Sequence, residues 1–280
     1  MIYDYVDYII LGSGSFTNLC AKYLRESDFK VTLLESNFGF NQRCKAFSIR
    51  NNIPYLSFKT KKELTNFLEN INSSTLIVSA ANRYLFPKKI IDKKNIDIIN
   101  YHSSILPKYP GRNAEAWAIF NGDVEGGISW HKVSVEVDAG ELIDQRKVKI
   151  NEQTTSFSLL KKYNQLSLES FKQIMNKISC NSLNLIQQDF TKRGDIYYSW
   201  MRPQEGILNI KNDEEEISRF LRSYDYGIFK NLGNFKLLTK NNILSEAYEY
   251  AIHDKFEFKP KFKNTMIIEK ESKIFEIVLI

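Results

Sequence analysis

Short apolar runs alternate with helical patterns along the first half of the chain. Residues 8–11 form a buried apolar run, residues 17–24 begin a helical pattern after a glycine turn, and residues 30–35 form a second apolar run. Buried strands that alternate with helices are typical of a doubly wound α/β sheet. We therefore expect an α/β fold with a mostly parallel, Rossmann-like sheet over residues 1–190.

The pattern changes after residue 190. Residues 154–188 are predicted to be helical, residues 190–195 are polar and loop-like, and a helix is predicted at 213–223, with final strands at 265–269 and 273–279. We expect a large first domain at 1–190, a linker at 191–206 and a small α+β or β-rich domain at 207–280.

Charge is distributed unevenly along the chain. The 280 residues carry 39 Lys and Arg against 33 Asp and Glu, a net charge of +6. Residues 201–280 contain 13 basic and 13 acidic side chains, so the whole excess lies in residues 1–200. Nucleic-acid surfaces usually cluster basic charge. The C-terminal part therefore does not favour a nucleic-acid partner.

Cysteine spacing and the apolar segments limit the class of protein. Cys20, Cys44 and Cys180 are scattered, with no Cys-x-x-Cys spacing, so neither a disulfide framework nor a metal site is predicted. The first residues lack a basic leader region, and no apolar run reaches the roughly 18 residues of a membrane helix. We expect a cytoplasmic protein with no membrane partner.

Polar side chains follow two of the predicted strands. Asn100 and His102 end an apolar run that starts at residue 96, and Asp138 follows the strand-like run 127–135, before Gly140. Residues i and i+2 of a strand point to the same side, and open α/β sheets bind ligands at the carboxyl ends of their strands. Taken singly, each residue could instead be an ordinary turn or surface residue. Together they predict one reaction centre.

A glycine pair lies between the first strand and the first helix. A full dinucleotide fingerprint is G-x-G-x-x-G. After Gly12 and Gly14 the third glycine position holds Thr17, so the motif is incomplete. The pair could form a close turn, or place Ser15 and the helix N-terminus near an anion. Because Glu35 ends the second strand, a nucleotide-binding protein or a hydride-transfer enzyme stays open.

The segment Asn-x-His-x-Ser-x-Leu-Pro at 100–107, followed by Gly111, an aromatic-rich helix and Asp-x-Gly at 138–140, resembles the signature of the folate-dependent formyltransferases. The match is close around residues 100–143 and looser over the first two hundred residues, as in the catalytic domain of methionyl-tRNA formyltransferases. The segment Arg202-Pro203-Gln204-Glu205-Gly206 resembles the Arg-x-Pro-x-Asp-Gly linker of sugar N-formyltransferases, to which the chain is most similar, although Gln204-Glu205 stands where those often show Glu-Asp.

The resemblance implies transfer of a formyl group from 10-formyltetrahydrofolate to a primary amine, with Asn100, His102 and Asp138 as catalytic residues. Asn100 can donate to the developing oxyanion. We assign His102 as the general base with Asp138 tuning it, and the reverse assignment stays open. No nucleophilic serine or cysteine is required, and His131 is interpreted as a structural or supporting residue.

The resemblance also implies binding residues. The loop 82–87 would line a pterin pocket together with the turn at 138–141; ordinary packing around Pro87 is the alternative. The candidate cofactor-binding residues are Arg83, Tyr84, Leu85, Phe86, Asp138 and Glu141. The candidate substrate-binding residues are Gly12, Gly14, Ser15, Ser103, Tyr224 and Tyr226. The two tyrosines could stack a base or belong to the core.

The zero net charge of residues 201–280 bears on which amine accepts the formyl group. RNA contact depends on Lys and Arg, so we expect a nucleotide-linked amino sugar of surface-polysaccharide biosynthesis and not a tRNA. Methionyl-tRNA and an amino-acid-type amine stay as alternatives, the latter because Trp130 is unusual for the sugar enzymes. A non-catalytic protein that kept the fold is the alternative of another class. The oligomeric state is open between a monomer and a homodimer.

Overall fold

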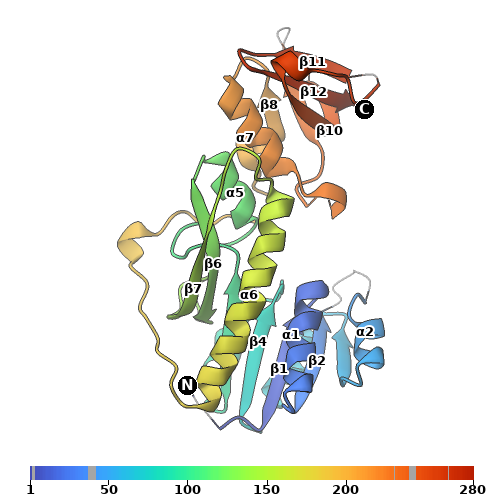
Figure 1. Cartoon of the computed structure of the whole chain (residues 1–280). Coiled ribbons are helices and arrows are strands. Elements are labelled where there is room, and N and C mark those ends of the chain that lie inside the picture. The colour runs from blue at the N-terminus through green and yellow to red at the C-terminus, as the bar shows by residue number, and fades with distance from the viewer. Residues whose placement is uncertain (2–3, 37–41, 230, 240–243, 264) are drawn as a thin grey trace. The chain divides into compact units, whose positions relative to one another are not determined.

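The computed structural model describes residues 1, 4–36, 42–229, 231–239, 244–263 and 265–280. They form two compact units (Figure 1). The first unit comprises Met1–Pro110, Gly127–Lys147 and Tyr163–Ile196, and the second comprises Gly111–Gly126, Val148–Lys162 and Tyr197–Ile280. The domain limits that the sequence suggests, at residues 190 and 207, stay a prediction.

A seven-stranded sheet with the order β3-β2-β1-β4-β5-β6-β7 is built mainly by the first unit. Its strands are β1 (Asp7–Gly12), β2 (Val31–Ser36), β3 (Tyr55–Phe58), β4 (Thr75–Ala80), β5 (Ile96–His102), β6 (Glu125–Lys132) and β7 (Leu142–Lys149). The strands β3, β2, β1, β4 and β5 run parallel, whereas β6 runs antiparallel to β5. The strand order reverses next to β1, and such a reversal opens a crevice at the carboxyl ends of the strands.

Helices cover both faces of this sheet. They are α1 (Ser15–Glu26), α2 (Lys45–Arg50), α3 (Lys61–Glu69), α4 (Lys88–Ile91) and α6 (Ser156–Ser179). Figure 1 shows α1 beside α6, and Tyr23 of α1 meets Phe171 of α6 edge to face, with ring centroids 5.9 Å apart. On the other face, Leu64 and Leu68 of α3 pack with Ile9 and Ile77. This double cover explains why nearly every residue of β1 and β4 is buried.

The second unit contains a five-stranded sheet with the order β11-β12-β10-β9-β8. Its elements are α5 (Ala114–Phe120), β8 (Ile207–Asn209), α7 (Glu214–Tyr224), β9 (Phe235–Leu238), β10 (Leu244–Asp254), β11 (Thr265–Glu269) and β12 (Lys273–Leu279), with short 3-10 turns at Pro203–Gly206, Gly227–Phe229 and Lys255–Glu257. A further 3-10 turn, Phe190–Lys192, belongs to the first unit. Asp213 caps α7 through a capping box with Glu216. The α7 side chains Phe220 and Leu221 join Ala116 of α5 in one core.

The predicted α/β class with a mostly parallel sheet and a small second sheet is confirmed. The last two strands lie where the pattern puts them, but the helical region 154–188 ends at Ser179, since Asn181 is left-handed (φ 52°). The apolar pattern does not predict β7, because this strand, at the end of the sheet order, buries few side chains. Within the described ranges, no helix is long and apolar enough to cross a membrane.

A buried carboxylate organises the second sheet. Glu276 of β12 is fully buried and accepts hydrogen bonds from the backbone N–H groups of Lys261 and Phe262, each at 2.8 Å. His253 Nε2 lies 3.0 Å from the same carboxylate. Burial raises the pKa of Glu276, but the backbone hydrogen bonds and His253 outweigh it, so the pKa is lowered from 4.5.

We expect Glu276→Gln to lower the free energy of unfolding by about 2 kcal/mol at neutral pH, because an amide nitrogen would face backbone donors. The folded pKa of Glu276 is lowered, so its stabilisation is present above pH 4.5 and is lost as the pH falls through the folded value. Urea unfolding as a function of pH measures both effects. The exposed Glu271→Gln is the control; equal losses in the two variants would contradict the role of Glu276.

Candidate functional site

The register of β5 and β6 brings four polar side chains to one face of the sheet. Asn100 of β5 lies directly opposite His131 of β6, and His102 lies opposite Ser129. The two residues on each strand are two positions apart, so all four side chains point to the same side of the sheet. Asn100 Nδ2 lies 3.1 Å from His131 Nε2. The expected pairing of Asn100 with His102 on one side of a strand is thus extended by a second imidazole.

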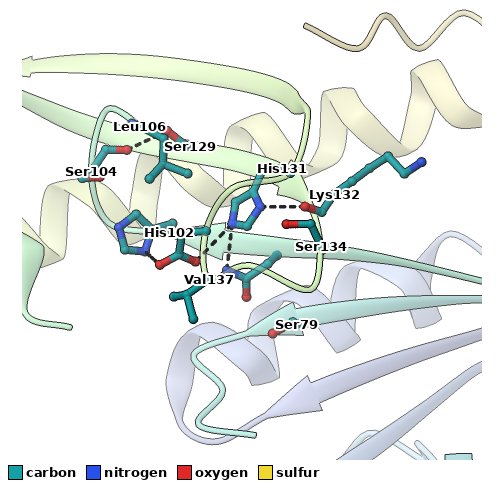
Figure 2. A network of polar contacts seen from close by, with 12 residues as sticks. Ser79, His102, Ser104, Leu106, Ser129, His131, Lys132, Ser134 and Val137 are labelled. Atoms are coloured by element: carbon teal, nitrogen blue, oxygen red, sulfur yellow. Dashed lines mark hydrogen bonds and ion pairs between the residues drawn. The ribbon is translucent and has the colours of Figure 1, made fainter. Parts of the chain in front are cut away.

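Asp138 lies between the two histidines. Its Oδ2 is 3.5 Å from His102 Nδ1, and its Oδ1 is 3.4 Å from His131 Nε2 (Figure 2). His102 and His131 are 5% and 2% exposed. Contacts of this length are common in unliganded active sites and shorten when a substrate binds. The three predicted catalytic residues therefore meet in the first unit, and their chemical roles stay a prediction.

The orientation of His102 follows from the carbonyl of Tyr109. His102 Nε2 lies 2.8 Å from this oxygen, which can only accept, so Nε2 carries a hydrogen. The other ring nitrogen, Nδ1, then faces Asp138. A carboxylate is also only an acceptor, so a hydrogen bond across this gap needs a further proton on Nδ1 or on the carboxyl group. His102 and Asp138 are thus arranged to share a proton.

The loop after β5 is held by Ser129 and Gln145. Ser129 Oγ donates to the carbonyl of Ser104 (2.7 Å) and accepts from the N–H of Leu106 (3.0 Å), as Figure 2 shows. Gln145 Nε2 donates to Ser129 Oγ and to the Leu106 carbonyl. The backbone of Tyr109 is left-handed (φ 54°). Such strained conformations are often found at functional sites. These bonds hold the loop whose carbonyl orients His102.

The loop that carries Asp138 is held from the segment after α6. Asp138 has a left-handed backbone (φ 50°). Gln188 Nε2 donates to the carbonyls of Asp138 (2.9 Å) and Gly140 (2.7 Å), and Arg193 donates to the carbonyl of Val137 (2.6 Å). A Cβ on Gly140 would lie 1.8 Å from the Lys132 carbonyl, so this position requires glycine. Gln188 and Arg193 are not predicted from the sequence, because they lie about fifty residues along the chain from the carbonyls that they contact.

We expect Gln188→Leu to reduce turnover by about 10- to 100-fold, because a displaced carboxylate loses reactive geometry. The change leaves the carbonyls of Asp138 and Gly140 without the side-chain donor that holds the loop. Steady-state kinetics of the catalysed reaction measures the effect. Gln165→Leu, on the exposed side of α6, is the control. Equal kinetics of Gln188→Leu and wild type would show that the loop does not need this anchor.

Glu35 closes the region around the glycine pair. It is 1% exposed and accepts hydrogen bonds from Ser13 Oγ, Tyr55 Oη and the N–H groups of Arg43 and Cys44. Four donors occupy the carboxylate that a dinucleotide ribose would need. These contacts disfavour the hydride-transfer alternative.

The two glycines differ in their surroundings. A Cβ on Gly12 would lie 1.8 Å from the carbonyl of Ala80, so Gly12 serves the close approach of β1 and β4. Gly14 (φ 104°) has open space where its Cβ would be, and Ser15 is exposed at the start of α1. Ser103 is half-buried in the loop after β5. Gly14, Ser15 and Ser103 are at least partly exposed; substrate binding by the set stays a prediction.

The loop expected to line a pterin pocket has a fixed conformation. Asn82 Oδ1 accepts from the N–H of Tyr84 (2.9 Å), and its Nδ2 donates to Ser79 Oγ (3.2 Å). Tyr84 is buried with its hydroxyl on Thr65, and its ring meets Phe86 edge to face. Leu85 is 71% exposed. Tyr84 and Phe86 thus contribute mainly packing.

The remaining predicted binding residues are placed as follows. Arg83 is exposed in the same loop. Glu141 pairs with Lys132 at 3.8 Å and accepts from Gln187. Tyr224 and Tyr226 lie in the core of the second unit, where Tyr226 donates to Glu115 and Tyr224 to the Pro203 carbonyl. Their burial agrees with the packing alternative for both rings.

Trp130 and the buried cysteines have structural surroundings. Trp130 is fully buried, stacks on Phe171 and donates to the carbonyl of Ser167, so it carries no information on an acceptor. Burial raises the pKa of the Cys20 thiol, and burial is also the main cause that raises the pKa of Cys44 to about 12. Neither thiol can supply a thiolate nucleophile. The described residues contain no cluster of three or more metal-ligating side chains suited to an ion.

Comparisons of the sequence with known proteins find similar formyltransferases. Residues 41–175 match the formyl transferase family. The methionyl-tRNA formyltransferase of Thermotoga maritima is 25% identical over 183 residues, which are 65% of this chain and 58% of that protein. The GDP-perosamine N-formyltransferase of Brucella melitensis is 30% identical over 151 residues, 53% of this chain and 56% of that protein. The matches thus span little more than half of each relative.

A comparison with solved structures extends over nearly the whole chain. An N-formyltransferase from Helicobacter canadensis, solved in complex with folinic acid and dTDP-3-aminofucose, superimposes with a TM-score of 0.71. The alignment covers 98% of this chain and 99% of that one at 19% identity. At this identity the likeness shows a common fold. Residues 41–175 are therefore similar to the formyl transferase family, and the chain shares its fold with the Helicobacter N-formyltransferase.

Proposed function

We propose that the protein transfers a formyl group from 10-formyltetrahydrofolate to a primary amine. The observation that carries this proposal is the meeting of Asn100, His102 and Asp138 within a segment that is similar to the formyl transferase family. Formyl transfer to an amine needs a donor for the developing oxyanion and an acceptor for the proton that the amine loses. This cluster offers both. Because the thiols of Cys20 and Cys44 are buried, we propose that the formyl group passes directly to the amine and not through either thiol.

We propose that a flat pterin binds at the loop 82–87 and the turn at 138–141. A pterin needs apolar groups for its faces and hydrogen-bonding groups for its edge. Leu85 extends an apolar side chain from a loop that Asn82 keeps in one conformation, and the turn at 138–141 carries the carboxylate. We propose that Arg83, Leu85 and Glu141 contact the folate. When bound, the folate supplies the formyl group.

The geometry favours Asp138 over His102 as the proton acceptor. Nε2 of His102 donates to the Tyr109 carbonyl, and Nδ1 is directed at Asp138, so both ring nitrogens are engaged. His102 then acts as a cation that holds and orients the carboxylate. Asp138 takes the proton that the amine loses and returns a proton to the departing nitrogen. Asn100 donates an amide N–H to the oxygen that gains charge.

A nucleotide-linked amino sugar is the acceptor that we propose. The Brucella relative acts, by its name, on GDP-perosamine, and the Helicobacter structure contains dTDP-3-aminofucose. In residues 201–280 the 13 basic side chains are balanced by 13 acidic ones, which gives no net field to attract RNA. The product would serve cytoplasmic steps of surface-polysaccharide synthesis.

The test is incubation with 10-formyltetrahydrofolate and a panel of nucleotide-linked amino sugars, with product mass as the readout. A mass gain of one formyl group on a single sugar, unaffected by competing tRNA, supports the proposal. The Asp138→Asn variant controls for uncatalysed transfer. If none of the sugars gains a formyl group while methionyl-tRNA does, the acceptor is wrong and the donor chemistry stands.

Methionyl-tRNA is the second candidate acceptor, because the Thermotoga relative carries that activity in its name. Binding of tRNA would need basic contacts, and the excess of +6 lies in residues 1–200. Tight binding at low salt that weakens steeply as salt is added would favour this candidate. Binding measured over a salt series with methionyl-tRNA therefore separates the two acceptors.

A further inference from the structure

His131 is a buried polar residue whose part in the site is not explained by the roles of the three predicted catalytic residues. It is 2% exposed and lies on β6, directly opposite Asn100. Its Nδ1 lies 2.8 Å from the carbonyl oxygen of Lys132, and its Nε2 lies 3.1 Å from Asn100 Nδ2 and 3.4 Å from Asp138 Oδ1 (Figure 2). Both ring nitrogens therefore face polar partners.

The Lys132 carbonyl determines which nitrogen of His131 is protonated. A carbonyl only accepts, so Nδ1 carries the hydrogen, and in the neutral ring Nε2 is an acceptor. The Asn100 amide then donates one N–H to Nε2. This bond fixes the orientation of an amide that could otherwise turn its oxygen toward the site. The second N–H of Asn100 remains a donor at a defined position.

The same bond affects the proton shared around Asp138. If Nε2 of His131 accepts from Asn100, it has no proton to give to Asp138, and the extra proton must lie between Asp138 and His102. The groups that face His131 are Asn100 and His102 from β5 and Asp138 from the following loop. The neighbouring charges form their own pairs, Lys132 with Glu141 and Arg193 with Glu136.

We propose that His131 is a positioning residue, which holds the Asn100 amide with its N–H toward the reacting oxygen and directs the shared proton to the His102–Asp138 pair. The kinetic part of this proposal rests on the proposed function. The protonation part concerns the free protein alone. The experiments below separate the two.

The first experiment is ¹⁵N NMR of the histidine rings. The chain contains three histidines, and His253, paired with Glu276 in the second unit, serves as an internal reference. Long-range ¹H–¹⁵N correlations distinguish the two neutral tautomers and the imidazolium. We expect His131 to be neutral with its proton on Nδ1 at about pH 7, while the extra proton belongs to His102 or Asp138. A His131 imidazolium, or a neutral ring protonated on Nε2, would overturn the proposal.

The second experiment compares His131→Leu with His131→Gln. Leucine removes the acceptor for Asn100, so kcat should fall about 10- to 100-fold with little change in KM, less than the loss of an oxyanion donor itself. The amide oxygen of glutamine can accept the same N–H, so His131→Gln should recover most of kcat. Equal losses in both variants, or no loss in either, would refute a positioning role.

Failure of the proposed function gives a different result. If wild type transfers no formyl group to any acceptor, the kinetic comparison fails, but the NMR spectra still show whether His131 holds the predicted tautomer. If both variants melt far below wild type, the loss of kcat reflects impaired folding. The tautomer of His131 in the wild-type protein then tests the proposal. A spectrum of His131→Leu in which the Asn100 side-chain amide resonances keep their wild-type shifts would also contradict the proposal.

Discussion

Asp138→Asn should reduce formyl transfer by about 10²–10⁴-fold without a large change in stability. The amide keeps the size of the side chain but loses the capacity to take a proton from the amine, and it can no longer balance a charge on His102. Asp138 is 11% exposed in a loop that Gln188 and Arg193 hold through the backbone, so the loop should persist. Single-turnover rates with donor and acceptor both saturating measure the chemical step.

The pH dependence of the same variant distinguishes the two assignments of the base. If Asp138 accepts the proton, Asp138→Asn should lower the rate and also remove the acidic limb of the pH–rate profile. The variant His102→Gln should keep part of that limb. Asp92→Asn, a surface change on a carboxylate that is paired with Lys88, is the matched control. Turnover of Asp138→Asn within a factor of about three of wild type would exclude the carboxylate from the chemistry.

Asn100→Asp should cost about 10²–10³ in kcat, as the removal of one oxyanion donor usually does. The substitution changes an N–H donor into a carboxylate of the same shape, which would repel the developing negative charge. It would also place two acidic groups near His131 Nε2, whose distances to Asn100 and Asp138 are 3.1 and 3.4 Å. The loss should therefore include a changed protonation of His131.

The measurement for Asn100→Asp is kcat together with the ¹⁵N spectrum of His131, which should shift toward the imidazolium. Asn66→Asp on the exposed side of α3 makes the same chemical change away from the site and serves as the control. An unchanged kcat in Asn100→Asp would mean that another group stabilises the oxyanion. A lower kcat with an unchanged His131 spectrum would separate the roles of Asn100 and His131.

The periodicity of the sequence was enough to predict the fold class, and the resemblance to formyltransferases singled out Asn100, His102 and Asp138 as the candidate reaction centre. Strands such as 8–11 and 75–79 are buried along their whole length because helices cover both faces of a parallel sheet. Asn100 and His102 share a face because the side-chain period of a strand is two. Asp138 follows a strand and precedes a glycine, and the structure places it beside both histidines.

Pairing between distant segments was not readable from the sequence. The role of His131 depends on the register of β6 against β5, which is antiparallel within an otherwise parallel set. A shift of one residue would turn His131 to the opposite face of the sheet. Gln188 and Arg193 resemble any polar residues of a loop until the chain brings them to the carbonyls of residues 137–140.

By itself, the sequence determined the α/β class, the apolar runs that form the parallel strands and the residue types of the centre, because these depend on local periodicity and on a short motif. Only the tertiary structure decided which ring nitrogen each histidine directs at Asp138, because the carbonyls of Tyr109 and Lys132 orient the two rings. It also placed Tyr224 and Tyr226 in the core. Burying the two rings stabilises the fold more than leaving them exposed to stack on a nucleobase would. Backbone carbonyls have no signature in a sequence, so the protonation pattern of the site could only come from the fold.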